Sequence, residues 1–278
     1  MKSFSVWPHS AKLFGSHFLL VLLCVVMAGG AAYFSARGIV TSHAADELTA
    51  HANYLAEDVT GNFSRLTEEM VWFTESPIFE QYKVHHNQEH LADLFVKQPG
   101  HFKTFAFLAP DGRTEVHMRG RSFREEEFSD PNLFAQAMAA HGMVHASLPP
   151  PEAGRQRRLR FALGVKTYFD EPVGVFMAEA PIAVLAELLL RTRVGGTGWA
   201  LLVTPDGMLL AASGLDTSTE AFTGQGGDWE SFRAGVAGNR NAHGAFRFNG
   251  VDVLAIARPT GARDWSVVTL LPQEHVTA

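Results

Sequence analysis

The chain has 278 residues, of which 46% are hydrophobic and 19% are charged. This length is typical of about two domains, and the charged fraction lies below the ~25% of ordinary soluble domains. Its 23 basic and 29 acidic residues give a net charge of −6, so no general basic field attracts nucleic acid. We therefore expect no nucleic-acid partner, and the low charged fraction indicates that part of the chain meets lipid rather than water.

The sequence offers little for metal or catalytic chemistry. Cys24 is the only cysteine, which excludes an internal disulfide, an iron–sulfur cluster and a thiolate zinc site. His86 and His90 have the spacing of one helical face, but the pattern supplies no third ligand, so we expect no metal and no cofactor. The nucleophile elbow, the phosphate-binding loop and the His-Glu-x-x-His motif are all missing from the sequence, and we expect that this chain is not an enzyme.

The first long segment is predicted to cross a membrane once. Residues 13–34 include no Asp, Glu, Lys or Arg, and ~20 apolar residues are enough to span a hydrocarbon core of ~30 Å. Lys2 and Lys12 precede the segment, whereas Asp46 and Glu47 follow it, so residues 1–12 should lie in the cytoplasm and the remainder outside the inner membrane. The alternative is a cleaved signal peptide, because small residues occupy positions 28–32.

A long helix is expected to continue from the membrane over residues 35–76. Pro77 should end it, because proline disfavours helical geometry in the residue before it. The apolar stripe has two interpretations: it packs on the chain's own sheet, or it forms the seam of a two-helix dimer. Its members recur at helical spacings of three and four at Leu48, Ala52, Leu55, Val59, Phe63, Leu66, Met70 and Phe73.

Beyond the helix, one strand–turn–strand pattern occurs twice. Phe105–Gly112 and Ala200–Gly207 each place an apolar run before the tripeptide Pro-Asp-Gly. Proline sets the backbone of the turn, aspartate bonds to its own backbone, and glycine accepts a positive φ, so each segment predicts a β-hairpin.

A second group of strands follows each hairpin. Asn249 and Gly250 separate two apolar runs, and Asn-Gly is the strongest short hairpin signal. Helices are predicted at 132–141 and 228–237, and a connecting helix at 181–191, whereas the proline-led, basic segment 149–158 is predicted to be an exposed loop. The additional strands are predicted at 160–166, 173–178, 245–248, 251–257 and 265–271. The fold class is therefore α+β, with two small modules built on antiparallel sheets.

This order of elements resembles the double Cache extracytoplasmic sensor domain, whose two modules share a PAS-like five-stranded sheet. The likeness covers 44–275; within it, 129–137 resembles the start of the pocket helix and 174–179 the closing strand. The resemblance implies a division into a cytoplasmic tail 1–12, a transmembrane helix 13–34, a stalk helix 35–76, a membrane-distal module 77–181 and a membrane-proximal module 182–278.

In that family the distal module binds a small molecule and the proximal module passes the change to the membrane. The output module is usually a histidine kinase, a diguanylate cyclase or a chemoreceptor rod, and no such segment occurs in this sequence. The resemblance therefore implies the periplasmic or extracellular sensor part of a receptor that forms homodimers. The alternative is a single-pass accessory or structural subunit of a cell-envelope complex, with the fold but without a ligand.

Amino-acid sensors of this family resemble one another in an arginine and aromatic cluster at the pocket helix and an acid on the closing strand. This chain keeps the acid as Glu179 and two rings as Phe128 and Phe134, but Asp130 stands where the arginine is expected. The departure implies an organic anion or another metabolite as ligand rather than an ordinary α-amino acid. Further pocket candidates are Arg121, Lys166 and Tyr168, although Arg121 also fits a solvated charged face.

Overall fold

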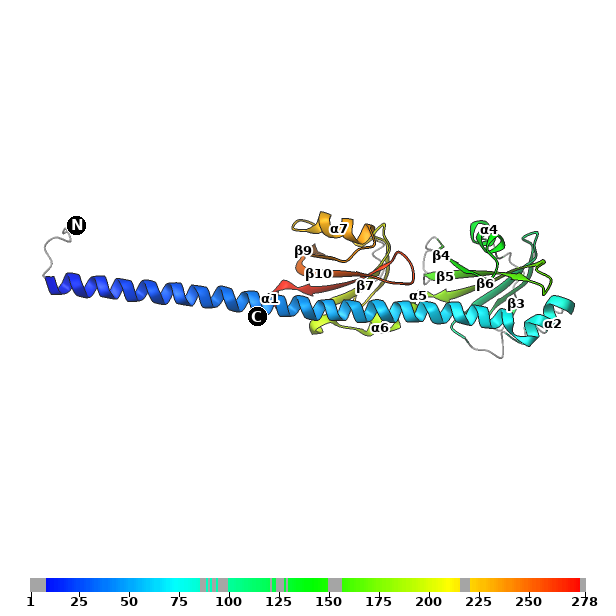
Figure 1. Ribbon diagram of the computed structural model, residues 1–278, viewed down its shortest axis with the longest axis horizontal. Coiled ribbons are helices and arrows are strands. Elements are labelled where there is room, and N and C mark those ends of the chain that lie inside the picture. The colour runs from blue at the N-terminus through cyan, green and yellow to red at the C-terminus, as the bar shows by residue number, and fades with distance from the viewer. Residues whose placement is uncertain are drawn as a thin grey trace.

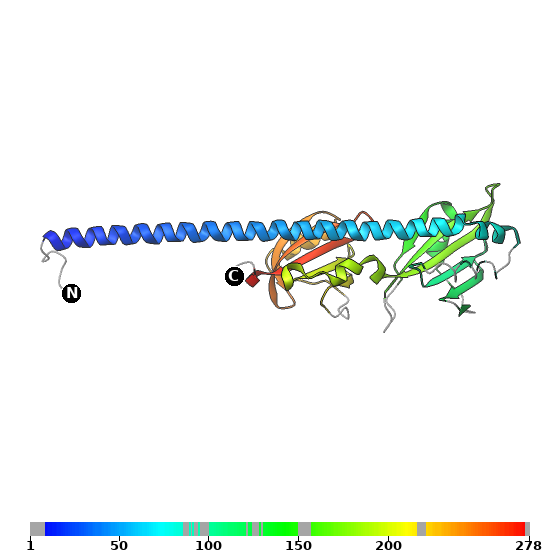
Figure 2. The same cartoon turned by 90° about the horizontal axis from the view of Figure 1, so that it is seen from below.

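The computed structural model describes residues 9–85, 89, 91, 94, 100–120, 122–123, 128, 130–149, 157–215 and 221–275, with the backbone alone at 9–16, 34 and 36–41. One helix, α1 (His9–Glu75), runs along two sheet modules that stand in line, and both views show it on the same side of each module (Figures 1 and 2). The two helices predicted at 13–34 and 35–76 are therefore one continuous element. Among the described residues, no helix combines the length and the apolar character that crossing a membrane requires.

The apolar stripe of α1 packs on the chain's own sheets. Leu55, Val59, Leu66 and Met70 are fully buried in one hydrophobic cluster that also includes residues of both modules. The interpretation of this stripe as a dimer seam is wrong, because its side chains are already covered. One helix face thus forms the shared core of the two modules.

The two sheets repeat the same antiparallel strand order. The distal order is β3-β2-β1-β6-β5-β4 and the proximal order is β8-β7-β11-β10-β9, which match when the edge strand β3 is left out. That strand makes the distal sheet six-stranded rather than five-stranded as expected. The distal strands are β1 (Thr104–Leu108), β2 (Thr114–Arg119), β3 (Ser122–Phe123), β4 (Val144–Ser147), β5 (Arg158–Lys166) and β6 (Pro172–Pro181). The proximal strands are β7 (Trp199–Val203), β8 (Leu209–Ala212), β9 (Ala242–Phe248), β10 (Val251–Pro259) and β11 (Ser266–Pro272).

The predicted turns form where their chemistry requires them. Gly112 and Gly207 close the two Pro-Asp-Gly turns with φ of 84° and 83°. Asn249 and Gly250 adopt φ of 48° and 81° between β9 and β10, as a type I′ hairpin needs. These local signals therefore predicted the hairpins of both modules correctly.

Short helices complete each module. α4 and α7 cover the sheet faces opposite α1, so each module has three layers (Figure 1). The connecting helix predicted at 181–191 is two short helices, because Ala186 leaves helical geometry at φ −108° and ψ 23°. The helices after α1 are α2 (Pro77–His85), α4 (Pro131–Ala139), α5 (Ile182–Leu185), α6 (Glu187–Arg191) and α7 (Trp229–Ala237), with 3-10 turns at Val194–Gly196 and Gln273–His275.

Candidate functional site: a charged cluster in the distal module

A row of polar side chains crosses the distal sheet on the face that α4 covers. The strand register places Glu179 of β6 between Thr104 of β1 and Arg160 of β5, and Arg160 beside Ser147 of β4. Partners in an antiparallel pair point to the same face, so these four side chains form one rung, which we call the polar rung. The next rung along the same face is mostly apolar, with Ala106, Met177 and Ala162 in the core beneath α4.

Glu179 is the charged centre of the polar rung. Its side chain is buried, yet Arg160 Nε donates to Oε1 at 2.7 Å and Arg158 Nη1 donates to Oε2 at 3.1 Å. Burial alone would raise the pKa of Glu179, but the hydrogen bonds and positive charges of Arg160 and Arg158 outweigh it and hold the pKa below its usual value. Glu179 is therefore an ionised carboxylate held between two guanidinium groups.

Asp130 ties the start of α4 to this rung. It caps the helix, accepting a hydrogen bond from the Leu133 backbone N–H at 3.2 Å, and its second oxygen accepts from Ser147 Oγ at 2.9 Å. Arg160 Nη1 lies 3.8 Å from the same oxygen, and its guanidinium sits over the Phe128 ring, 4.9 Å from the ring centre. The helix start, an aromatic ring and the sheet therefore meet around one arginine.

Two polar atoms on this face are buried without a hydrogen-bond partner among the described residues. Thr104 is 2% exposed, and its Oγ1 has no partner in the described part of the chain although Thr104 stands directly beside Glu179 in the register. His145, opposite Ala162 on the neighbouring rung, has a buried Nε2 that likewise has no partner among the described residues. A buried hydroxyl left unpaired costs about 1–3 kcal/mol, so a polar group that paired with Thr104 Oγ1 would stabilise this face.

The structure brings together some of the residues predicted for the pocket. Three of them meet at the polar rung: Glu179, Phe128 and Asp130. Phe134, a residue of α4, packs against the apolar core on the same face of the sheet. Arg121 lies outside the described residues, as do His86 and His90.

Lys166 and Tyr168 lie elsewhere, at the opposite end of β5 from Arg160. Lys166 pairs with Asp170 at 2.7 Å, and Tyr168 is 97% exposed in the β5–β6 turn. These two residues are therefore separated from the rest of the predicted pocket by the length of β5. Within the described part of the chain, no group of three or more His, Cys, Asp or Glu side chains could hold a metal ion.

The two arginines that hold Glu179 are not among the residues predicted for the pocket. Arg158 falls in the segment predicted to be an exposed loop, and Arg160 is the first residue of a predicted strand. The signal was the Arg-x-Arg spacing at the start of a strand, because residues two apart point to the same face of a sheet. The sequence lacks the arginine that the family has at the pocket helix, and the guanidinium groups beside Glu179 come from β5.

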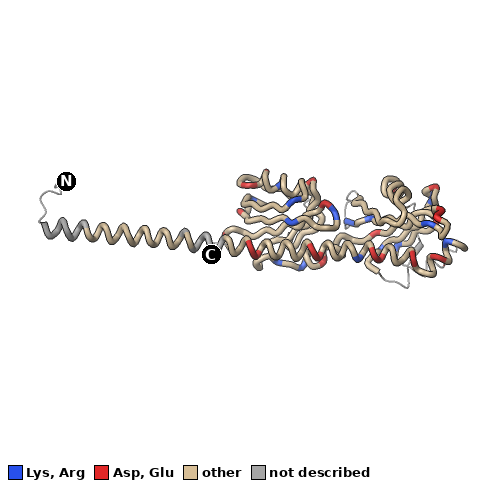
Figure 3. The backbone as a smooth tube through the Cα atoms, viewed as in Figure 1, with Lys and Arg blue, Asp and Glu red and all other residues tan. Residues whose placement is uncertain are grey.

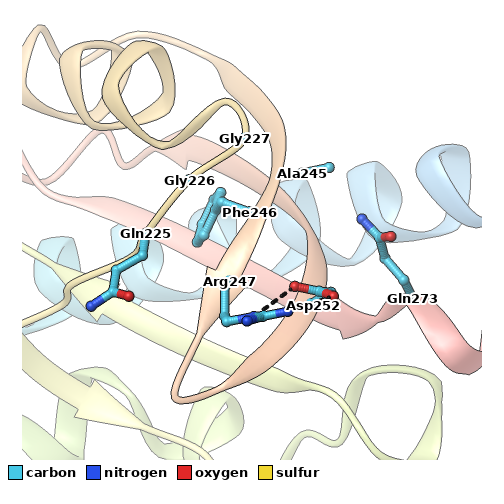
Figure 4. Close-up of a pocket in the computed structure, with 8 residues that line it drawn as sticks. All are labelled: Gln225, Gly226, Gly227, Ala245, Phe246, Arg247, Asp252 and Gln273. Atoms are coloured by element: carbon cyan, nitrogen blue, oxygen red, sulfur yellow. Dashed lines mark hydrogen bonds and ion pairs between the residues drawn. The ribbon is translucent and has the colours of Figure 1, made fainter.

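The corresponding face of the proximal module is filled by aromatic rings. Phe222, Trp229, Phe232 and Phe246 are at most 9% exposed, and their ring centres lie 5.1–6.4 Å apart under α7. A hollow of about 460 Å³ exists instead at the outer edge of this module, beside β9 (Figure 4). Its charged residues, Arg247 and Asp252, are exposed and pair with each other, at 3.0 and 3.2 Å.

Comparisons with known proteins identify the fold. No family model and no curated protein matches the chain. Among solved structures, the sensory domain of the Campylobacter jejuni chemoreceptor Tlp3 with isoleucine bound has a TM-score of 0.65 at 9% identity, covering 87% of this chain and 98% of that one. The domain of a sensory box/GGDEF family protein from Vibrio parahaemolyticus has a TM-score of 0.62 at 13% identity, with coverages of 84% and 99%. The ligand-binding domain of the Pseudomonas fluorescens chemoreceptor CtaA with L-leucine has a TM-score of 0.58 at 12% identity, with coverages of 87% and 100%.

Two of these structures are sensory or ligand-binding domains of chemoreceptors and the third is a domain of a sensory box/GGDEF family protein; the chain shares their Cache-type fold over 84–87% of its length. Their sequences have diverged to the point where identity carries no residue correspondence. The fold resemblance suggested by the order of the sequence motifs is thereby confirmed.

Proposed function

We propose that the chain is the extracytoplasmic small-molecule sensor of a membrane-anchored signal-transduction receptor, and that its ligand binds at the polar rung of the distal module. The observation that carries the proposal is the pair of guanidinium groups around buried Glu179, next to the unpartnered hydroxyl of Thr104. The aromatic filling of the proximal module favours the distal module as the ligand-binding one. Solved structures with this fold hold isoleucine and L-leucine, which supports a small-molecule ligand.

The chemistry of the rung favours an organic anion. Both oxygens of Glu179 and both oxygens of Asp130 already accept hydrogen bonds from the protein, so a ligand ammonium would have to displace an internal donor. A ligand carboxylate instead competes with Glu179 for the guanidinium groups and accepts a hydrogen bond from the Thr104 hydroxyl. The ligand of this proposal is therefore a small organic acid, with α-amino acids as the class to be tested against it.

The proposal includes a membrane anchor at 13–34, with the amino end in the cytoplasm and both modules outside the inner membrane. Described side chains from Phe18 to Tyr33 are apolar and exposed, and this stretch of α1 has no charged residue in Figure 3. Pairing of two copies would use the outward face of α1, where Tyr54 is 60% and Trp72 is 47% exposed. The output module would belong to the same receptor or to a partner protein.

A thermal-shift screen of the purified chain tests the proposal. The panel holds small mono- and dicarboxylates and, as the matched set, the α-amino acids with the same carbon skeletons. A ligand present at a concentration of about 100 times its Kd stabilises the folded chain by ~2.7 kcal/mol, which raises the Tm of a chain of this size by about 5–10 °C. The increase should disappear in Arg160→Gln.

Each outcome of the screen has a distinct meaning. A response to amino acids alone would overturn the organic-anion class and leave the sensor role standing. If no compound raises the Tm and the chain copurifies with one protein in fixed stoichiometry, the accessory-subunit alternative replaces the sensor.

A further inference from the structure

We infer that Arg157 couples the polar rung to the proximal module through its contact with Met208, and so sets the relative position of the two modules. The inference rests on the proposed function and deepens it, because it names the contact by which a change at the polar rung would be transmitted from the distal to the proximal module. It rests on contacts made by Arg157, just before β5, and by Arg158 and Arg160 at the start of that strand.

The first contact is between side chains of different modules. Arg158 donates to Glu179, whereas Arg157 Nη1 approaches Met208 Sδ to 2.7 Å. Met208 follows the Pro-Asp-Gly turn between β7 and β8, and its backbone N–H and C=O both bond to Thr204. Arg157 therefore contacts the side chain of a methionine whose backbone is fixed in this turn of the proximal module.

The second contact is made by the backbone of the same arginine. Only Ala180 and Pro181 separate Glu179 from Ile182, the first residue of α5, and the Ile182 N–H donates to the Arg157 carbonyl at 3.0 Å. At the other end of α5, the Leu185 carbonyl accepts from Asn62 of α1 at 3.1 Å. Arg157 thus holds the start of the connection between the modules, and that connection is fastened to α1.

These contacts make the ion pairs of Glu179 a clamp between the ends of β5 and β6. Arg158 and Arg160 hold the end of β6 against the start of β5 with charge-assisted hydrogen bonds. When a ligand anion takes over these guanidinium groups, the clamp opens next to α5. Arg157 then shifts the β7–β8 turn together with the connection, as small displacements at packed interfaces do in switching proteins.

The test uses the full chain and needs no ligand. Cys24 is replaced by serine, and spin labels are attached at Phe169→Cys in the β5–β6 turn and at Glu230→Cys on α7, both exposed positions. Glu179→Gln opens the clamp chemically, and we expect it to move the mean label distance, measured by double electron–electron resonance, by about 1–2 Å. In an Arg157→Ala background the same Glu179→Gln substitution should produce no such shift.

Controls keep the result interpretable. Arg191→Ala removes another arginine near the connection, one that forms an exposed pair with Glu187, and should leave the shift intact. If the Glu179→Gln variant does not fold, Arg158→Gln takes its place in the comparison with and without Arg157→Ala, because it removes one of the two ion pairs of the clamp. A shift that persists undiminished without Arg157 overturns the inference, as does a folded clamp variant with no shift.

Failure of this inference and failure of the proposed function are separable. A change in label distance that does not depend on Arg157 would not bear on ligand binding, because no ligand is used in the experiment. An empty ligand screen would remove the sensor proposal while the Arg157 contact could still govern the position of the modules.

Discussion

Removing the charge of Glu179 tests the electrostatics of the polar rung. Glu179→Gln keeps the shape of the side chain but removes the carboxylate that both arginines bind, which leaves Arg160 with the more distant carboxylate of Asp130, at 3.8 Å. Breaking a buried pair from one side typically costs 3–5 kcal/mol, and these guanidinium groups are 21–24% exposed and can regain some hydration. We therefore expect a loss of about 3 kcal/mol in the free energy of unfolding, equivalent to about 6–12 °C in Tm.

Urea unfolding followed by tryptophan fluorescence measures this loss. The matched control is Asp252→Asn, which breaks another two-bond arginine–carboxylate pair, with Arg247, at an exposed site. The control should leave the urea midpoint unchanged, because exposed ion pairs contribute little. Equal and small effects of both substitutions would refute the view that Glu179 is a buried, strongly held anion.

Further substitutions probe the rest of the site. The pKa of Glu179 is lowered on folding, so its contribution is present above the ordinary value of 4.5 and is lost as the pH falls toward the folded-state pKa; urea midpoints against pH should fall less steeply below 4.5 in Glu179→Gln. Thr104→Val removes an unpartnered hydroxyl, so calorimetry should show unchanged or higher stability by about 1 kcal/mol but a smaller ligand-induced rise in Tm; a clear loss of stability would show that the hydroxyl has a partner. Asp130→Ala should lower the free energy of unfolding by about 1 kcal/mol, because the cap of α4 is lost, and Asp130→Asn should lower it much less, because asparagine also caps helices. Equal losses in the two variants would argue against capping. Burial and a 2.5 Å hydrogen bond to Glu115 raise the pKa of Tyr82, so absorbance titration of the folded chain should show one tyrosine that resists ionisation, and Tyr82→Phe should remove it.

Local signals predicted most of the fold. The Pro-Asp-Gly and Asn-Gly turns act within four residues, and the stripe of α1 follows a fixed helical spacing, so both could be recognised without tertiary information. The break at Ala186 could not be foreseen, because the sequence around it is uniformly favourable to a helix. The extra edge strand β3 is too short, at two residues, to leave a periodic signal.

The site was harder to predict because strand register decides it. Arg160 and Glu179 are 19 residues apart in sequence and become direct neighbours only through the β5–β6 pairing. The same pairing separates Lys166 and Tyr168 from them, since these residues stand at the turn end of the strand pair. Glu179 was predicted through the family resemblance, which implies an acidic residue on the closing strand, whereas its partners required knowledge of which residues of β5 lie opposite.

Isothermal titration calorimetry with the most stabilising carboxylate tests the central claim most directly. The titration is performed on the unmodified chain, on Arg160→Gln in the distal module, and on Arg247→Gln at the proximal hollow, each confirmed as folded by circular dichroism. We expect the carboxylate to bind the unmodified chain and Arg247→Gln with equal affinity, and to bind Arg160→Gln at least about tenfold more weakly, a loss of ~1.4 kcal/mol. Undiminished binding to Arg160→Gln, or loss of binding in Arg247→Gln alone, would contradict it.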